Sequence, residues 1–216
     1  MGITERKLRE KRQRKELILE AARRLFQERG FLNVTISDIA EAVELSIGTL
    51  YLYFKNKDDI YAGLACLGSQ KVDALLDDAL HLKKKLSQKE LVSFIEKFMR
   101  IYDDYGCYFD ILMFNFKGKG TINLSDGYAN TLREVTQSSM MKSIQYFSRR
   151  LPKERSDKIE AARAATFVVW ALLLGLTQVL NVGRTEIFNE EDVQRVINKA
   201  AKLLSEIPPE LTLSEG

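Results

Sequence analysis

Apolar residues recur at helical spacing along most of this chain, and alternating runs typical of β-strands are scarce. The first apolar stripe repeats at i, i+1, i+4 and i+5, which predicts a helix from about Lys7 or Lys11 to Glu28. Gly30 stands where a C-terminal glycine cap is expected. Later stripes predict further helices over about 56–85, 87–105, 108–116, 127–150, 156–181 and 189–207. Gly106 is predicted to interrupt the aromatic-rich part of this series.

Between the first and the longer helices, the pattern predicts two very short helices joined by a tight turn. Thr35, with Asp38 three residues later, is a candidate N-cap for the first, and Ser46 is the candidate N-cap for the second. Glu44 and Leu45 form the turn. Such short helices bury little surface by themselves, so we expect this unit to present its second helix to a partner. With about nine helices in all, the fold class is all-α.

Composition adds a charge polarity to this picture. The 216 residues are 45% hydrophobic and 29% charged, values typical of one large globular domain or two small ones. Residues 1–15 hold seven Lys or Arg residues and two Glu residues, whereas the remaining residues carry a net charge of −2. A basic N-terminus on a slightly acidic body favours a polyanionic partner. The alternative is a solvated, partly disordered N-terminus.

Other residues restrict the chemistry. Cys66 and Cys107 both lie in apolar segments, which favours buried thiols over a disulfide. Charged residues rather than an apolar stretch follow the first four residues, so we expect a cytoplasmic protein. His81 is the only histidine, which excludes most metal sites and hydrolytic triads. Gly118 and Gly120 lack the rest of a phosphate-binding loop. We therefore expect no enzyme activity, no metal and no cofactor.

The segment TISDIAEAVELSIGTLYLYFKNKDDI resembles the N-terminal signature of the tetracycline-repressor (TetR) family of transcriptional regulators. The match covers roughly residues 11–60 and combines Phe-x-x-x-Gly, Thr-Ile-x-x-Ile-Ala and Ser-x-Gly-Thr-Leu-Tyr-x-Tyr-Phe-x-x-Lys. The resemblance implies an N-terminal three-helix DNA-binding domain with a helix-turn-helix, residues 1–56. It also implies a larger C-terminal helical domain, residues 57–216, for ligand binding and dimerisation.

The resemblance also implies DNA contacts. Gly48 and Thr49 would lie against the major-groove floor, and the hydroxyls of Tyr51 and Tyr53 would reach phosphates. In the alternative arrangement, Leu52 and Tyr53 pack against the first helix. The full set of implied contacts is Thr35, Ser37, Ile47, Gly48, Thr49, Tyr51, Tyr53 and Lys57, with Arg9, Arg12 and Lys15 from the basic N-terminus.

Ile47 departs from the pattern, because readers often carry a polar or basic side chain there. An isoleucine contacts a thymine methyl group but forms no bidentate pair with a base. We therefore expect specificity to depend on a methyl contact and on DNA shape.

The C-terminal region has a helix that is apolar on nearly every side. Residues 164–183 carry no formal charge, a length sufficient to span a membrane. Thr166, Thr177, Gln178 and Asn181 interrupt this stretch, so a buried helix is favoured. A four-helix bundle of two chains supplies neighbours on every side and places two recognition helices about 34 Å apart on an inverted-repeat operator. The predicted homodimer interface is Phe167, Trp170, Leu174, Gly175, Val196, Ala200 and Leu203.

Aromatic and methionine side chains are dense between residues 94 and 116. Rings and methionines fill cores, and they also line pockets for variable apolar ligands. We favour a largely hydrophobic small-molecule effector, although Asp103, Asp104 and Asp110 leave a cationic one open. The candidate pocket residues are Phe94, Phe98, Tyr102, Tyr105, Phe109, Met113, Met140 and Trp170.

The expected function is therefore a ligand-responsive regulator of transcription, most simply a repressor that a small effector releases from double-stranded DNA. One alternative is a constitutive or architectural DNA-binding protein without an effector. The other is a membrane-associated helical protein built around residues 164–183.

Overall fold

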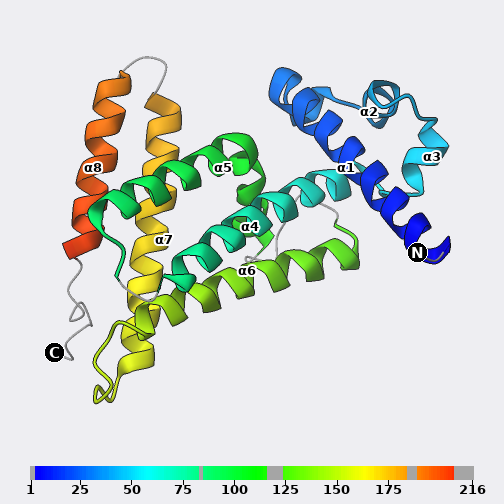
Figure 1. Cartoon of the computed structure of the whole chain (residues 1–216). Helices are drawn as coiled ribbons and strands as arrows, with labels where there is room; N and C mark the ends of the chain where they lie inside the picture. Colours follow the sequence, from blue (N-terminus) through cyan, green and yellow to red (C-terminus); the bar gives the residue numbers. More distant parts are fainter. Residues whose placement is uncertain (1–2, 83–84, 116–123, 184–188, 207–216) are drawn as a thin grey trace. The chain divides into compact units, whose positions relative to one another are not determined.

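The computed structural model describes residues 3–82, 85–115, 124–183 and 189–206, with the backbone alone for 3, 106–115 and 181–183. Within these ranges there are eight α-helices and one short 3-10 helix, and no strand (Figure 1). The elements are α1 (Ile3–Arg29), η1 (Phe31–Asn33), α2 (Ile36–Ala42), α3 (Ile47–Tyr51), α4 (Lys57–His81), α5 (Gln88–Asn115), α6 (Asp126–Ser148), α7 (Lys158–Gly183) and α8 (Glu190–Glu206). The all-α prediction is confirmed.

The helix boundaries differ from the sequence prediction most clearly at α1 and α5. α1 begins at Ile3, one or more turns before the predicted start, so the basic residues near the N-terminus lie on a helix. α5 continues through Gly106 to Asn115, whereas a break and a separate helix over 108–116 were predicted. A glycine inside a helix costs only about 1 kcal/mol relative to alanine, which a long helix can absorb. The continuous α5 explains why eight rather than nine α-helices are described.

The chain divides into two compact units, and α4, α5 and α6 each contribute to both. The first unit comprises residues 1–67 and 108–132, and the second comprises 68–107 and 133–216. The boundary predicted at residue 56 refers to functional domains and does not coincide with the limits of these packing units. It stays a prediction.

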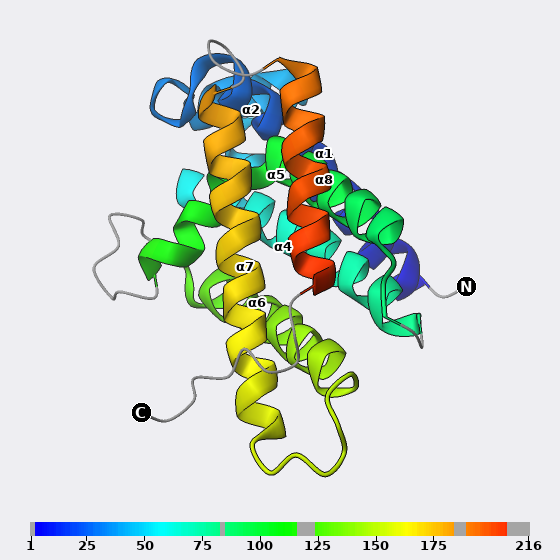
Figure 2. The same ribbon diagram turned by 90° about the vertical axis from the view of Figure 1, so that its left-hand side faces the viewer.

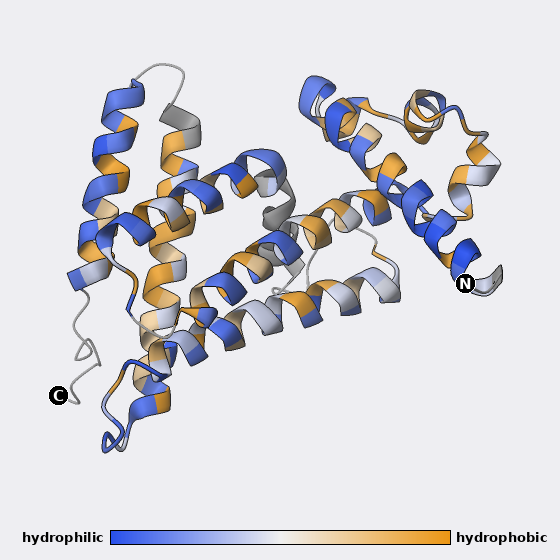
Figure 3. Cartoon of the chain, viewed as in Figure 1, coloured by the Kyte–Doolittle hydropathy of each residue, from blue (hydrophilic) through white to orange (hydrophobic). Residues whose placement is uncertain are grey.

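The first unit is built around α1. Helix α1 packs against α2 and η1, and α2 packs against α3. Figure 3 shows a largely hydrophilic N-terminal half of α1, whereas its later turns place apolar residues in the core. The core residues with the least exposure are Ile18, Ala22, Val34, Ile39, Leu50, Phe54, Ile60, Ala62, Leu64 and Ala65.

The second unit contains the C-terminal part of α4, most of α5 and α6, and all of α7 and α8. Helices α7 and α8 lie side by side and antiparallel (Figure 2). A polar clasp joins α4 to α6: the Lys142 ammonium lies 2.6 Å from Asp73 and 2.5 Å from Asp77. Ser138 and Ser139 donate hydrogen bonds to the same Asp73 oxygen. These contacts fix the walls of the cavity described below.

Candidate nucleic-acid interface and apolar pocket

A complete capping box begins α2. The Thr35 hydroxyl accepts a hydrogen bond from the Asp38 amide, and the Asp38 carboxylate accepts one from the Thr35 amide at 2.7 Å. The hydrogen bonds from Thr35 lower the pKa of Asp38. Two otherwise unpaired amides at the start of the helix are satisfied in this way. The predicted N-cap is therefore confirmed, and it fixes where α2 starts.

The turn between α2 and α3 is tight and partly strained. Glu44 has φ +54°, in the left-handed region that favours glycine, and the Leu45 amide donates to Ala40 O at 2.9 Å. The Ser46 hydroxyl then accepts from the Thr49 amide, which caps α3. Leu50 and Phe54 anchor the segment in the core with at most 1% exposure. Because both ends are fixed, the outer face of α3 is presented in one orientation.

That outer face is unusually apolar for a solvent surface. Leu52 is 76% exposed, Tyr51 is 50% exposed and Ile47 is 45% exposed. Gly48 is exposed too, and a Cβ built on it would meet nothing closer than Ser46 Oγ at 3.9 Å. The fold therefore has no steric need for glycine at this position, whereas a closely approaching partner has one.

The other predicted contacts occupy different environments. Thr35, Ser37, Arg9 and Arg12 are exposed, and Thr49 and Tyr53 are half-buried. Thr49 also shares a 2.8 Å hydrogen bond between hydroxyls with Ser46.

Two predicted basic contacts direct their ammonium groups into the protein. Lys57 Nζ donates to the carbonyl oxygens of Phe31 at 2.8 Å and Val34 at 2.9 Å, and it lies 4.3 Å from the Phe31 ring centroid. Lys15 Nζ lies 4.8 Å from the ring centroid of Tyr128 and 5.4 Å from that of Phe54. Burial lowers the pKa of Lys15. Phosphate contacts for these two lysines stay predictions.

Asp59 ties the start of α4 to the start of α6 within the first unit. This buried carboxylate accepts from the Ser125 amide at 2.9 Å and from the Lys55 amide at 3.3 Å. The Asp59 amide in turn donates to the Asn56 side chain at 2.7 Å. The segment that leads into α6 is thus held to the helix-turn-helix unit by a charged acceptor.

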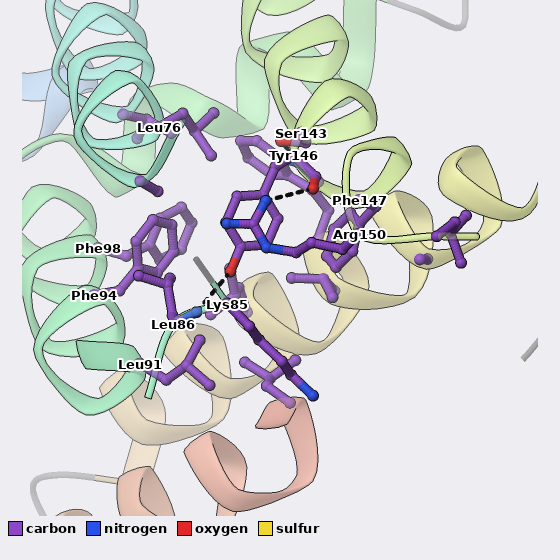
Figure 4. Close-up of a pocket in the computed structure, with 18 of the residues that line it drawn as sticks. Leu76, Lys85, Leu86, Leu91, Phe94, Phe98, Ser143, Tyr146, Phe147 and Arg150 are labelled. Atoms are coloured by element: carbon purple, nitrogen blue, oxygen red, sulfur yellow. Dashed lines mark hydrogen bonds between the residues drawn. The ribbon is translucent and has the colours of Figure 1, made fainter. Parts of the chain in front are cut away.

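The second unit holds a cavity of about 320 Å³, at the small end of the usual range for ligand pockets. Its walls come from α4, α5, α6 and α7, with Leu204 from α8. Three of the predicted pocket residues, Phe94, Phe98 and Trp170, line it. Figure 4 labels Phe94 and Phe98 on its wall. The rings of Phe98 and Trp170 meet edge to face with centroids 6.0 Å apart.

Three of the other predicted pocket residues do not line this cavity. Tyr102 and Tyr105 are buried and Met140 is half-buried, but none of the three is among its lining residues. The side chains of Phe109 and Met113 lie outside the described residues. High aromatic density therefore identified the right helix but did not separate Phe94 and Phe98, which line the cavity, from Tyr102 and Tyr105, which do not, because core and cavity residues share the same composition.

Sequence reasoning missed the polar lining. Ser143, Tyr146 and Arg150 come from α6 and the residue pair after it, and Lys85 precedes α5. Trp170 Nε1 donates to Ser143 Oγ at 3.1 Å, and the Leu86 amide donates to the Tyr146 hydroxyl at 3.4 Å. Ser143, Tyr146 and Arg150 have a near-helical spacing, which is a signal that they share one face of α6. Only the tertiary fold shows that this face borders a cavity.

Helix α7 has a long exposed apolar face, which includes the predicted dimer residues Phe167 and Gly175. Phe167 is 67% exposed, Val168 48% and Val179 60%, and Leu203 on α8 is 59% exposed. Gly175 is exposed as well, and a Cβ there would meet nothing within 4 Å. Leu174, Trp170 and Val196 are half-buried, and Ala200 is buried.

Helix α7 is also long and apolar enough to cross a membrane, with a mean hydropathy of 1.7 in its most apolar stretch, 22% of which is buried. Thr166 and Thr177 are buried, and their hydroxyls donate hydrogen bonds to main-chain carbonyls of the same helix. Among the described residues, no three His, Cys, Asp or Glu side chains gather to hold a metal ion.

Comparisons with known proteins agree with this geometry. The sequence model of the bacterial regulatory proteins of the tetR family matches residues 18–64. The HTH-type transcriptional regulator SAR2658 of Staphylococcus aureus (strain MRSA252) is 29% identical over 154 residues, covering 68% of this chain and 71% of that protein. For three other curated relatives, the match spans between 24% and 42% of their own length.

Solved structures share the fold over nearly the whole chain. The TetR-family regulator PfmR from Thermus thermophilus aligns with a TM-score of 0.58 and 19% identity, covering 87% of this chain and 96% of that one. The fatty acid degradation regulator FadR from Bacillus halodurans aligns with a TM-score of 0.58 and 17% identity, covering 89% and 95%. At these identities the likeness concerns the fold alone.

Proposed function

Because the chain belongs to the TetR family of helix-turn-helix transcriptional regulators, we propose that it is a cytoplasmic repressor that a small effector releases from its operator. DNA binding and regulation of transcription follow from the family. The effector, the direction of regulation and the homodimer are the proposed parts. The largely apolar cavity in the second unit is the observation that carries the effector, because a purely architectural DNA-binding protein has no need of one.

The proposed DNA contacts centre on the exposed face of α3. Ile47, Gly48, Thr49 and Tyr51 would meet the major groove, with Tyr53, Thr35 and Ser37 near phosphates. Arg9 and Arg12 on the hydrophilic part of α1 would add backbone or minor-groove contacts. Lys57 and Lys15 would join them only by leaving the carbonyls and rings that now hold their ammonium groups.

Substitution of Gly48 separates a DNA contact from a structural requirement. Gly48→Ala leaves the fold intact because the new methyl group meets nothing within 3.9 Å, and alanine is a better helix former. The methyl group would hold α3 off the groove, so we expect operator affinity to fall at least about tenfold. Gly127→Ala on α6 is the matched control, since a Cβ there also has space.

Fluorescence anisotropy with labelled operator and thermal unfolding supply the two readouts. Unchanged affinity for Gly48→Ala would refute close approach of α3 to the groove. Selection of binding sequences from a random pool supplies the operator and also tests Ile47. We expect thymine beneath that side chain, and a strong preference for guanine would contradict the proposed methyl contact.

We also propose that the exposed apolar face of α7, with Leu203 of α8, pairs two copies of the chain. Val168 and Val179 are eleven residues, about three helical turns, apart and share one stripe of α7, with Phe167 next to Val168. Gly175 lies between them on the same stripe and leaves room for a second helix to approach. Such pairing would set two recognition helices one DNA turn apart, about 34 Å.

A charge placed on the face tests the pairing. Phe167→Asp is expected to convert the dimer to a monomer in sedimentation equilibrium and to weaken binding to a two-half-site operator. Met141→Asp adds the same charge at an equally exposed apolar site on α6 and serves as the control. Equal masses for wild type and Phe167→Asp would contradict the proposed interface. Recovery of the protein only with detergent would instead favour a membrane role for α7.

The effector is tested separately from the DNA contacts. Native mass spectrometry of the purified protein is expected to detect a retained apolar molecule, and adding that molecule is expected to lower operator affinity. A protein whose operator affinity no bound molecule changes would be a constitutive DNA binder, the second candidate function.

A further inference from the structure

The charged side chains that line the cavity have one sign. Apart from the neutral polar groups of Ser143 and Tyr146, its walls are otherwise mostly apolar, with Leu76, Leu91, Phe94, Phe98, Trp170 and Leu173 among the lining residues. Both charged residues of the described lining, Arg150 and Lys85, are cations. A neutral hydrocarbon gains from such walls but makes no use of a guanidinium group.

The Arg150 guanidinium group is held in a defined orientation. Its Nη1 donates to Tyr146 O at 2.6 Å and its Nη2 donates to Leu82 O at 3.4 Å. Its central carbon lies 3.4 Å from the centroid of the Tyr146 ring, and Figure 4 shows it among the side chains around the cavity. Two main-chain carbonyls and a ring therefore position this cation before any ligand arrives. A pre-positioned guanidinium group loses little rotamer entropy when it binds a carboxylate.

Electrostatics favour an anion at this place. Burial lowers the pKa of Arg150, which means that its charged form loses hydration in the fold. An anion close to the guanidinium group offsets that loss, whereas a neutral or cationic group does not. The negative charge of Glu90 acts on Tyr146. However, the Glu90 carboxylate accepts hydrogen bonds from the amide and the hydroxyl of Ser87, each at 2.7 Å, and Glu90 is not among the residues that line the cavity.

We propose that the cavity binds an amphiphile that consists of an apolar chain ending in a carboxylate, with its head on Arg150 and its chain along the aromatic walls. This inference rests on the proposed function, because it names the chemical class of the effector at the same site. A cavity of about 320 Å³ suits a chain of moderate length rather than a bulky ring system.

Trp170 supplies a direct readout of binding. It is the only tryptophan of the chain, it lines the cavity, and its indole nitrogen donates to Ser143. Dodecanoate, dodecanol and dodecyltrimethylammonium share one chain and differ in the charge of the head. Each is titrated below its micelle concentration while the Trp170 emission is recorded. We expect dodecanoate to bind at least about tenfold more tightly than the other two.

Arg150→Gln tests the head-group contact, and Arg149→Gln is the matched control because the neighbouring arginine is exposed and does not line the cavity. Arg150→Gln is expected to weaken dodecanoate binding by about 10- to 100-fold and to leave dodecanol binding within about twofold. Dodecanol binding thus shows that the variant still has its cavity. Arg149→Gln is expected to bind both as wild type does.

Three results overturn the inference: equal affinities of the wild type for dodecanoate and dodecanol, preference for the ammonium compound, or no binding of any of the three. A parallel titration of the protein–operator complex keeps the two proposals apart. If dodecanoate binds through Arg150 but leaves operator affinity unchanged, the inference about the cavity stands and the proposed release mechanism fails.

Discussion

Replacement of Lys57 by methionine distinguishes a structural tie from a phosphate contact. The sequence motif places this lysine at the DNA, whereas the fold uses its ammonium group to join two carbonyl oxygens, those of Phe31 and Val34. Methionine keeps most of the apolar stem, so the substitution removes the charge and its hydrogen bonds with little change in packing. The loss leaves the end of the 3-10 helix without its connection to the start of α4.

The magnitude follows from the contacts. A hydrogen bond to a charged group contributes ~1.5–3 kcal/mol, and a cation–π contact at a partly exposed site adds about 0.5–1 kcal/mol. Because Lys57 is only half-buried, water replaces part of what is lost, and we expect a total of about 2–3 kcal/mol. For a chain of this length that corresponds to a fall in Tm of about 4–12 °C.

Two measurements decide between the roles. Thermal and urea unfolding of Lys57→Met are compared with those of Lys55→Met, an exposed neighbour whose hydrogen bond to Asp59 comes from the main chain. The salt dependence of operator binding is then measured for both variants. Unchanged stability of Lys57→Met together with a salt slope smaller by about one unit would refute the tie and identify a phosphate contact.

Further predictions concern the first unit. Thr35→Ala removes the cap of α2 and is expected to lower the free energy of unfolding, measured with urea at neutral pH, by about 1 kcal/mol. Thr35 holds the pKa of Asp38 below its ordinary 3.8. The difference in stability between wild type and variant should therefore shrink, and not grow, as the pH falls through that value. Gly63→Val drives its side chain into Leu19, since even a Cβ there would lie 2.8 Å from Leu19 Cδ2, and calorimetry should show a loss of about 1–3 kcal/mol rather than a neutral change. Burial raises the pKa of the Cys66 thiol to about 11, so peptide mapping at pH 8 should find iodoacetamide on Cys66 only after unfolding; fast labelling of the native protein would contradict its burial.

Local signals predicted the helix-turn-helix well because its chemistry is local. The capping box of Thr35 and Asp38, the N-cap at Ser46 and the buried pair Leu50 and Phe54 all lie within a few residues of the groups they satisfy or contact. Spacing alone therefore suffices to infer which face of α3 is free. Gly106 misled the prediction because a local penalty of about 1 kcal/mol was weighed without the packing of the long helix around it.

The same reasoning from local sequence signals could not predict long-range contacts. Lys57 and Phe31 are 26 residues apart, and nothing in the pattern shows that the ammonium group turns toward two carbonyls. Lys15 likewise reaches Tyr128, whose position depends on how α6 begins. The cavity has the same origin. Arg150 stands in a polar segment of the sequence, and it lines the cavity only because α6 is packed with α4, α5 and α7.

The hydrogen bond between Asp59 and Ser125 bears on how new regulators arise from old ones. A chimera that joins residues 1–56 of this chain to the body of another regulator separates Lys15 from Tyr128 and supplies a foreign segment to the start of α6. In nature or in the laboratory, recombination would therefore preserve the fold better with breakpoints other than a single cut at residue 56. The graft that preserves the packing unit transfers residues 1–67 together with 108–132, two pieces that are separate in the gene and belong to one unit of the fold.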